Sequence, residues 1–149
     1  MDTSSLPHLS ALLATRSIRS IVRSTDLAQV GDFLTNYIYT LMRIGIKGKS
    51  GSIHVWDNSL AQAARDSQLR RYFGSRTPKD SLADGVEALV AYFYLKELMT
   101  LEEMVLLLSS WVSPDDFISR KAEHTACASA FEQLIKKFLN LSKDHFDDL

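Results

Sequence analysis

The stretch KDSLADGVEALVAYFYL, residues 79–95, sets two carboxylates within the pattern of a buried helix. On a helix, positions three apart lie on one face, about 5–6 Å apart between Cβ atoms, so Asp84 and Glu87 should project side by side. The apolar residues around them mark a largely buried helix: Leu82, Val86, Leu89, Val90, Phe93 and Leu95. Because carboxylates leave water only when they are paired or bind a metal, the two acids predict a cation partner.

A third carboxylate lies in DLAQVGDFLTNYIYTLMRIGI, residues 26–46, where Asp32 follows Gly31 inside an otherwise apolar helical pattern. Glycine within a helix costs about 1 kcal/mol relative to alanine. Its presence therefore suggests that another backbone approaches closely at this point. Asp32 is the third candidate for the cation site.

Composition limits the class of protein. The chain has 149 residues, 46% of them hydrophobic and 23% charged, which fits one globular domain over residues 1–149. It has no apolar run long enough for a membrane span, and its first residues lack the basic start and apolar core of a signal peptide, so a cytoplasmic location is expected. With a formal net charge of −1, any nucleic-acid surface must be local.

Hydrophobic periodicity predicts an all-α helical bundle without strands. Pro7 suits the first turn of the first helix, and glycines in the segment GIKGKSGS end the second. We expect six helices, over residues 4–24, from Thr25 or Asp26 to about Ile44, and over residues 55–73, 79–95, 101–111 and 113 to about 140. The acidic tail, residues 141–149, is expected to be frayed.

Three stretches together resemble the ribonuclease III domain, and they occur in the family's order between about residues 26 and 96. VGDFLTNYIYTL resembles its signature helix with Leu-Gly-Asp, and DNSLAQAAR resembles its Gly-Asn-Thr/Ser-Leu-Ala helix. KDSLADGVEALVAYFYL resembles its Lys-x-Ser-x-Leu-Ala-Asp-x-x-Glu-Ala-Leu segment. The resemblance implies the all-α ribonuclease III endonuclease-domain fold, in the compact form of the Mini-III and archaeal ribonuclease III-like proteins. No double-stranded-RNA-binding domain is expected after the last helix.

The resemblance also implies an active site. It assigns Asp32, Asp84 and Glu87 to the acidic catalytic cluster that binds Mg²⁺, for which Mn²⁺ can substitute. Lys79 would sit near this cluster and the scissile phosphate; its alternative role is a solvated lysine at a helix start. Ala28 departs from the family pattern, which has a glutamate one turn before the aspartate. Mini-III ribonucleases also lack the full acidic set and still cut RNA.

Basic residues suggest an RNA surface despite the balanced charge. Arg16, Arg19 and Arg23, at i, i+3 and i+7, form one stripe on the predicted first helix, and Lys47 and Lys49 occupy a loop. A second basic segment precedes the acidic pair: Arg65, Arg70, Arg71, Arg76 and Lys79. Each stripe alone is more often a solvated helix face, so the loop is the better RNA candidate.

The motif pair Asn58 and Ser59 also has two interpretations. In the first, both residues are structural and hold the start of the third helix beside the site. In the second, Asn58 contacts an RNA ribose.

Two functions remain open at this stage. The first is a metal-dependent endoribonuclease that hydrolyses double-stranded or structured RNA as a homodimer, with its partner bound through the signature helix. The second is a non-catalytic RNA- or protein-binding scaffold, which Ala28 favours. Three acids together favour the enzyme. The apolar pattern of the signature helix fits a dimer interface or a fully buried helix in a monomer.

Overall fold

Helices make up the regular structure throughout the part of the chain that the computed structural model describes, residues 1–51 and 54–149, and no strand occurs there. The all-α prediction is therefore confirmed. The helices, in chain order, are α1 (Pro7–Leu13), α2 (Ile18–Val22), α3 (Thr25–Lys47), α4 (Asp57–Asp66), the 3-10 helix η1 (Leu69–Tyr72), α5 (Lys79–Leu95), α6 (Leu101–Ser109), the 3-10 helix η2 (Pro114–Phe117) and α7 (Arg120–Leu141). In this part of the chain, no helix is both long and apolar enough to cross a membrane.

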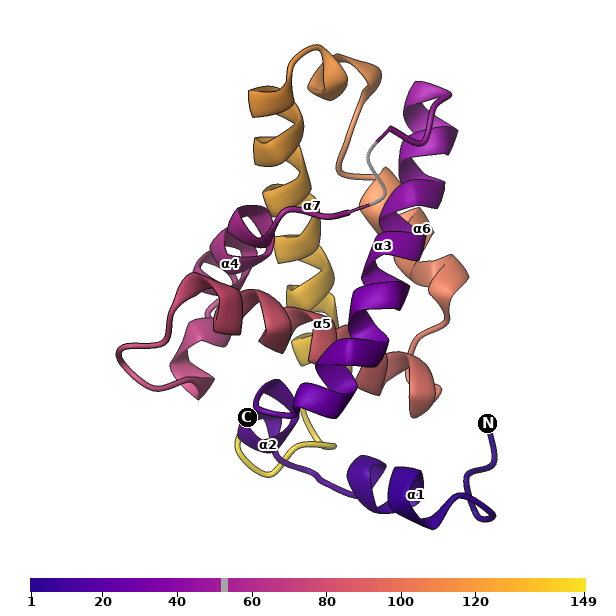
Figure 1. The fold of residues 1–149 in the computed structure, drawn as a ribbon, viewed down its shortest axis with the longest axis vertical. Coiled ribbons are helices and arrows are strands. Elements are labelled where there is room, and N and C mark those ends of the chain that lie inside the picture. The colour runs from indigo at the N-terminus through magenta and orange to yellow at the C-terminus, as the bar shows by residue number, and fades with distance from the viewer. Residues whose placement is uncertain (52–53) are drawn as a thin grey trace.

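Helix α5 lies at the centre of the fold, where it packs against α2, α3 and α4, while α7 closes the core behind it (Figure 1). Its bounds are those predicted. Every residue from Leu82 to Phe93 is buried except Asp84. A helix that is apolar on all sides can be stable only inside a core. A carboxylate on this helix is therefore surrounded by protein on most sides.

Helices α3 and α5 touch backbone to backbone at Gly31. A Cβ atom added there would lie 1.8 Å from the carbonyl oxygen of Glu87. The close approach predicted from this glycine is thus confirmed, and its partner is the turn of α5 that carries Glu87. The crossing places Asp32, the next residue of α3, beside the acidic turn of α5.

The prediction of one continuous helix over residues 4–24 is wrong, because this segment forms two helices, α1 and α2. Ser17 begins α2 by accepting a hydrogen bond from the Ser20 amide, which ends the helical path from α1. Ser24 then caps α3 by accepting from the Leu27 amide. Arg16 consequently lies between two helices, and the predicted stripe of Arg16, Arg19 and Arg23 along one helix does not exist.

Two further predicted helices are also divided. Residues 55–73 form α4 and η1, separated at Gln68, whose φ of 73° is left-handed. Ser113 and Pro114 begin η2 rather than the last helix, and α7 starts six residues later, where Ser119 accepts from the Ala122 amide. In each case a local cap stops a pattern whose hydrophobic spacing continues beyond it.

The C-terminal tail is docked, not frayed as predicted. Asp148 accepts hydrogen bonds from the Ile18 amide at 2.8 Å and the Arg19 amide at 3.1 Å, so it caps α2 from 130 residues away. Phe146 is buried in the main core. Arg16 contacts Asp147 at 3.3 Å, and its guanidinium also donates to the carbonyl of Asp144. The tail and α2 therefore hold each other in place.

Candidate active site

The three predicted carboxylates meet at the crossing of α3 and α5. Glu87 is 7% exposed, and its carboxyl group forms a hydrogen bond with that of Asp32. Asp84 lies one turn before Glu87, close enough to act on it electrostatically. Of these three carboxylates, Glu87 is buried, whereas Asp32 and Asp84 are exposed at the surface. The buried surroundings that the apolar pattern predicts for these acids therefore hold for Glu87 but not for Asp32 or Asp84.

Negative charge dominates this cluster. Burial raises the pKa of Glu87 to about 9, helped by the hydrogen bond with Asp32 and by the charges of Asp32, Asp84 and Asp57. Partial burial and the charges of Asp57, Asp80 and Asp32 also raise the pKa of Asp84. Among the described residues, no Lys or Arg forms an ion pair with Asp32, Asp84 or Glu87. The charges of these carboxylates are therefore not neutralised by an ion pair within this part of the chain.

Two further acids, Asp57 and Asp80, join the cluster and were missed by sequence reasoning. Asp57 is the first residue of α4, and Asp80 lies in the first turn of α5; the two side chains share a hydrogen bond. Burial, and then Asp80, raise the pKa of Asp57, while the charge of Lys79 opposes the rise. Asp80 stands four residues before Asp84, a helical spacing that could have revealed it. The family motif at Asn58 and Ser59 places the start of α4 beside the site, but no local pattern indicates that Asp57 joins the acids.

The neighbours of the cluster come from three segments. Lys79 is exposed at the start of α5 and close enough to Asp57 to lower its pKa, so it lies near the acids as the family resemblance implies. On α3, Asn36 donates a hydrogen bond to Oδ1 of Asp32 at 3.2 Å and accepts one from the Val55 amide at 2.7 Å. Asn36 therefore links Asp32 to the chain that enters α4.

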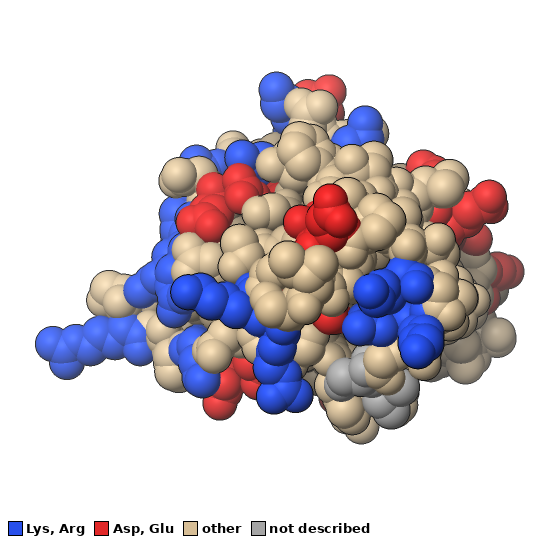
Figure 2. Space-filling view, turned by 90° about the horizontal axis from the view of Figure 1, so that it is seen from above, with Lys and Arg blue, Asp and Glu red and all other residues tan. Residues whose placement is uncertain are grey.

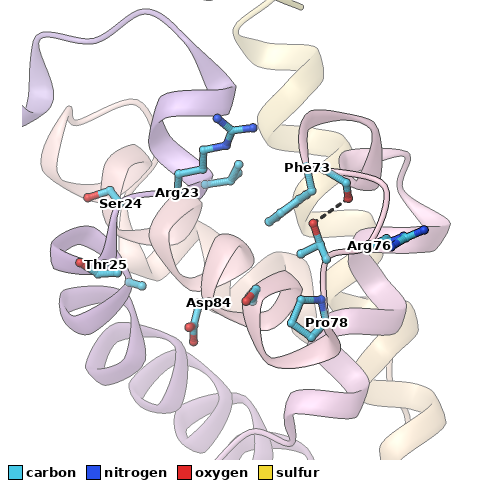
Figure 3. A pocket seen from close by; sticks show the side chains of 12 residues that line it. Arg23, Ser24, Thr25, Phe73, Arg76, Pro78 and Asp84 are labelled. Carbon is cyan, nitrogen blue, oxygen red and sulfur yellow. Dashed lines mark hydrogen bonds between the residues drawn. The ribbon is translucent and has the colours of Figure 1, made fainter.

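An open cleft of about 520 Å³ lies between the start of α3, residues 73–78 and the start of α5. We call it the α3–α5 cleft. Asp84 stands at its edge (Figure 3). Ala28 forms part of its wall. The position at which the sequence departs from the family pattern thus faces the same space as Asp84.

The donor chemistry fits Mg²⁺, which prefers carboxylate oxygens and often keeps several waters. Among the described residues, however, no group of three or more His, Cys, Asp or Glu side chains is arranged to hold a metal ion by itself. Mg²⁺ commonly binds through one or two carboxylates together with substrate phosphates, so a complete protein cage is not needed. The surplus of negative charge is the feature of this structure that suits such an ion.

The predicted RNA-binding residues occupy separate places. Lys47 and Lys49 are exposed at the end of α3, whereas Arg19 and Arg23 are exposed near its start, about 34 Å away for a helix of 23 residues. Lys and Arg side chains also gather in separate groups on the face shown in Figure 2. Arg16 is engaged by the tail.

The structural interpretation of the pair Asn58 and Ser59 holds for Ser59. Ser59 is buried, and its hydroxyl donates to the His124 carbonyl at 3.0 Å, so this residue joins α4 to α7. Asn58 is exposed beside Asp57. Its contact with RNA stays a prediction.

One face of α3 is apolar and exposed. Phe33 is the most exposed of its residues, at 71%, and the others are Val30, Tyr37, Leu41 and Ile44. The opposite face packs on α5 and α6. The alternative of a fully buried signature helix in a monomer is therefore wrong.

Comparison with known families agrees with this geometry. The family model described as Ribonuclease III matches residues 25–142, which run from the start of α3 to just past the end of α7. The chain belongs to the ribonuclease III family. No curated protein matches it. Family membership supports an RNA endonuclease function in general, and members of the family generally use divalent metals.

Proposed function

We propose that this protein is a metal-dependent endoribonuclease that hydrolyses phosphodiester bonds in double-stranded or structured RNA. The observation that supports the proposal best is the meeting of Asp32, Asp84 and Glu87 at the crossing of α3 and α5, where none of the three forms an ion pair with a described Lys or Arg. A fold that served only as a scaffold would gain nothing from a buried carboxyl group beside two others, because such a group destabilises it.

In this proposal Asp32, Glu87 and Asp84 hold Mg²⁺ together with phosphate oxygens of the RNA. The ion, when bound, supplies positive charge to the attacked phosphate and lowers the pKa of a water molecule. Hydrolysis joins the water oxygen to phosphorus and breaks the bond to the leaving 3′ oxygen, which takes up a proton. Glu87 is held in place by the contact of its backbone with Gly31. Lys79, on the same helix, adds positive charge near the phosphate.

The exposed apolar face of α3 supports a symmetric homodimer in this proposal. Association through a two-fold axis would place Phe33 and its neighbours against their own copies and remove them from water. Asp32 adjoins Phe33 on the same helix, so such an interface would bring two acidic clusters near each other. Two clusters across one duplex can cut both strands.

A non-catalytic RNA-binding scaffold is the second candidate. Ala28 favours it, because this position brings no carboxylate to the cluster. The absence, among the described residues, of a preformed group that holds a metal also favours it. The same cluster of acids would then be a remnant.

Cleavage of a defined RNA duplex tests the choice between the two. The purified protein should cut it with Mg²⁺ or Mn²⁺ and stop when a chelator is added. Asp32→Asn and Glu87→Gln should each lower the rate by a factor of 100 or more, as expected when a charged group that acts in the transition state is lost. Asp26→Asn, an exposed acid in the first turn of α3, is the matched control and should cut normally. Tight binding of the duplex without cleavage across a series of metals would favour the scaffold.

A further inference from the structure

The α3–α5 cleft has a volume and a lining that the acidic cluster does not explain. Its volume of about 520 Å³ lies within the range of small-molecule sites. Asp84 alone among the five clustered acids lines it. The rest of the wall is apolar, hydroxylic or basic, and it includes Ala28, whose short side chain leaves this space open. The cleft is thus a separate compartment that opens beside the proposed cutting site.

Two arginines that border the cleft have no partner in the part of the chain that the structure describes. Arg23 lies at the end of α2, and Arg76 lies in the segment before α5, on another side of the cleft (Figure 3). Within residues 1–51 and 54–149, neither guanidinium makes a hydrogen bond or an ion pair, whereas Arg16, Arg43 and Arg70 all do. Free guanidinium groups are the usual protein ligands of phosphate oxygens.

An aromatic ring stands between these arginines. Phe73 projects into the cleft (Figure 3), and its ring tip rests on Gly85, where a Cβ atom would lie 2.2 Å from Cζ. Single unstacked bases are commonly held by stacking on such rings. The exposed hydroxyls of Thr25 and Ser81 also line the space and can bond to a base or a ribose.

We propose that the α3–α5 cleft binds one unpaired nucleotide of the RNA substrate, with its base against Phe73 and its flanking phosphates at Arg23 and Arg76. This inference rests on the proposed endonuclease function and names the substrate class more narrowly: duplex RNA with an unpaired nucleotide next to the cut. A base inside a duplex cannot enter a side compartment without leaving the stack, and the cost is lowest for a base that is already unpaired. Asp84 at the edge of the cleft links the bound nucleotide to the proposed metal site.

A set of matched RNAs tests this inference. One duplex is fully paired, the second carries one unpaired adenosine at a series of positions, and the third has an abasic nucleotide in place of that adenosine. With Mg²⁺, the unpaired adenosine should increase the rate of cleavage at the adjacent bond by about fivefold or more. This factor corresponds to the lower end of the free-energy range for stacking one base on an aromatic side chain. The abasic RNA should lose that gain, because it keeps the flexibility of the bulge but not the base. Equal cutting of the adenosine and abasic RNAs would overturn the proposal.

Variants separate the cleft from general RNA binding. Phe73→Leu and Arg76→Gln should remove the preference for the unpaired adenosine, measured for each variant as the ratio of its cleavage rate on that RNA to its own rate on the fully paired duplex. Arg120→Gln, an exposed arginine at the start of α7, is the matched control and should keep the preference. Because Phe73 packs on Gly85, circular dichroism and melting temperature must first show that Phe73→Leu is folded; Arg76→Gln makes no such contact. A preference retained in both cleft variants would contradict the proposal.

RNA binding can be measured without catalysis, so this experiment tests the cleft even if the protein does not cleave RNA. In chelator, 2-aminopurine replaces the unpaired adenosine, and its fluorescence reports whether the base stacks in the cleft. Wild-type protein should quench it, and Phe73→Leu should not. Quenching without any RNA cleavage would support the cleft and overturn the endonuclease proposal. Cleavage without quenching would do the reverse.

Discussion

At the scale of single residues, Glu87 should make the stability of the metal-free protein depend on pH. Its pKa in the folded protein, about 9, lies above its ordinary value of 4.5. A raised pKa in the folded state means that stability from this group is complete below about pH 4.5 and is lost as the pH rises toward 9. In chelator, the melting temperature should therefore fall between pH 5 and pH 9.

The variant Glu87→Gln tests whether the raised pKa of this buried carboxyl group causes the loss of stability at high pH. An amide cannot ionise, so the variant should melt several degrees higher than wild type at pH 8 in chelator and show a smaller decline with pH. Added Mg²⁺ should raise the melting temperature of wild type more than that of the variant by linkage. Differential scanning fluorimetry measures both. Parallel pH curves for the two proteins would show that Glu87 keeps an ordinary pKa.

At Ala28, a substitution can restore the glutamate that the family pattern has at this position. Ala28→Glu places a carboxylate one turn before Asp32, facing the space that Asp84 borders. The added ligand charge should lower the Mg²⁺ concentration for half-maximal cleavage and lower the melting temperature in chelator. Unchanged metal dependence in Ala28→Glu would place its carboxylate away from the metal.

At the scale of helices, the contact between α3 and α5 depends on the absence of one methyl group. Gly31→Ala would place Cβ 1.8 Å from the Glu87 carbonyl oxygen, so the helices must separate. The expected loss is about 1–3 kcal/mol of unfolding free energy, the usual cost of overpacking, together with lost cleavage because Asp32 moves from Glu87.

Gly45→Ala is the matched control on the same helix. Nothing lies within 4 Å of a Cβ atom at this position, so the change should stabilise the protein by about 0.5–1 kcal/mol through helix propensity. Urea unfolding of the two variants gives both free energies. A Gly31→Ala protein as stable as wild type would mean that α3 and α5 do not meet at this backbone contact.

At the scale of the whole molecule, the exposed face of α3 should set the oligomeric state. Phe33→Glu would bring a charge into the proposed two-fold interface twice and should convert a dimer into a monomer with little change in helix content. Leu106→Glu changes an apolar side chain on α6 that is 62% exposed and should leave the dimer intact. Sedimentation velocity at micromolar concentration distinguishes the two species. Wild-type protein that sediments as an active monomer would rule out the dimer.

The sequence by itself determined the helical class, the bounds of α5, the close approach at Gly31 and three of the five clustered acids. Each of these has a local signal: a helical period, an unusual glycine, or a motif with fixed spacing. The same local reasoning failed at residues 4–24, 55–73 and 113–140, where caps at Ser17 and Ser119 and the left-handed Gln68 interrupt a continuous apolar pattern.

Only the tertiary structure decided which distant groups meet. Asp57 reaches the acids because α4 packs against α5, and Asp148 caps α2 from the other end of the chain. The α3–α5 cleft likewise joins residues from three segments. None of these pairings leaves a periodic trace, because a contact between helices depends on the angle and register at which they pack, which the pattern along one helix does not specify.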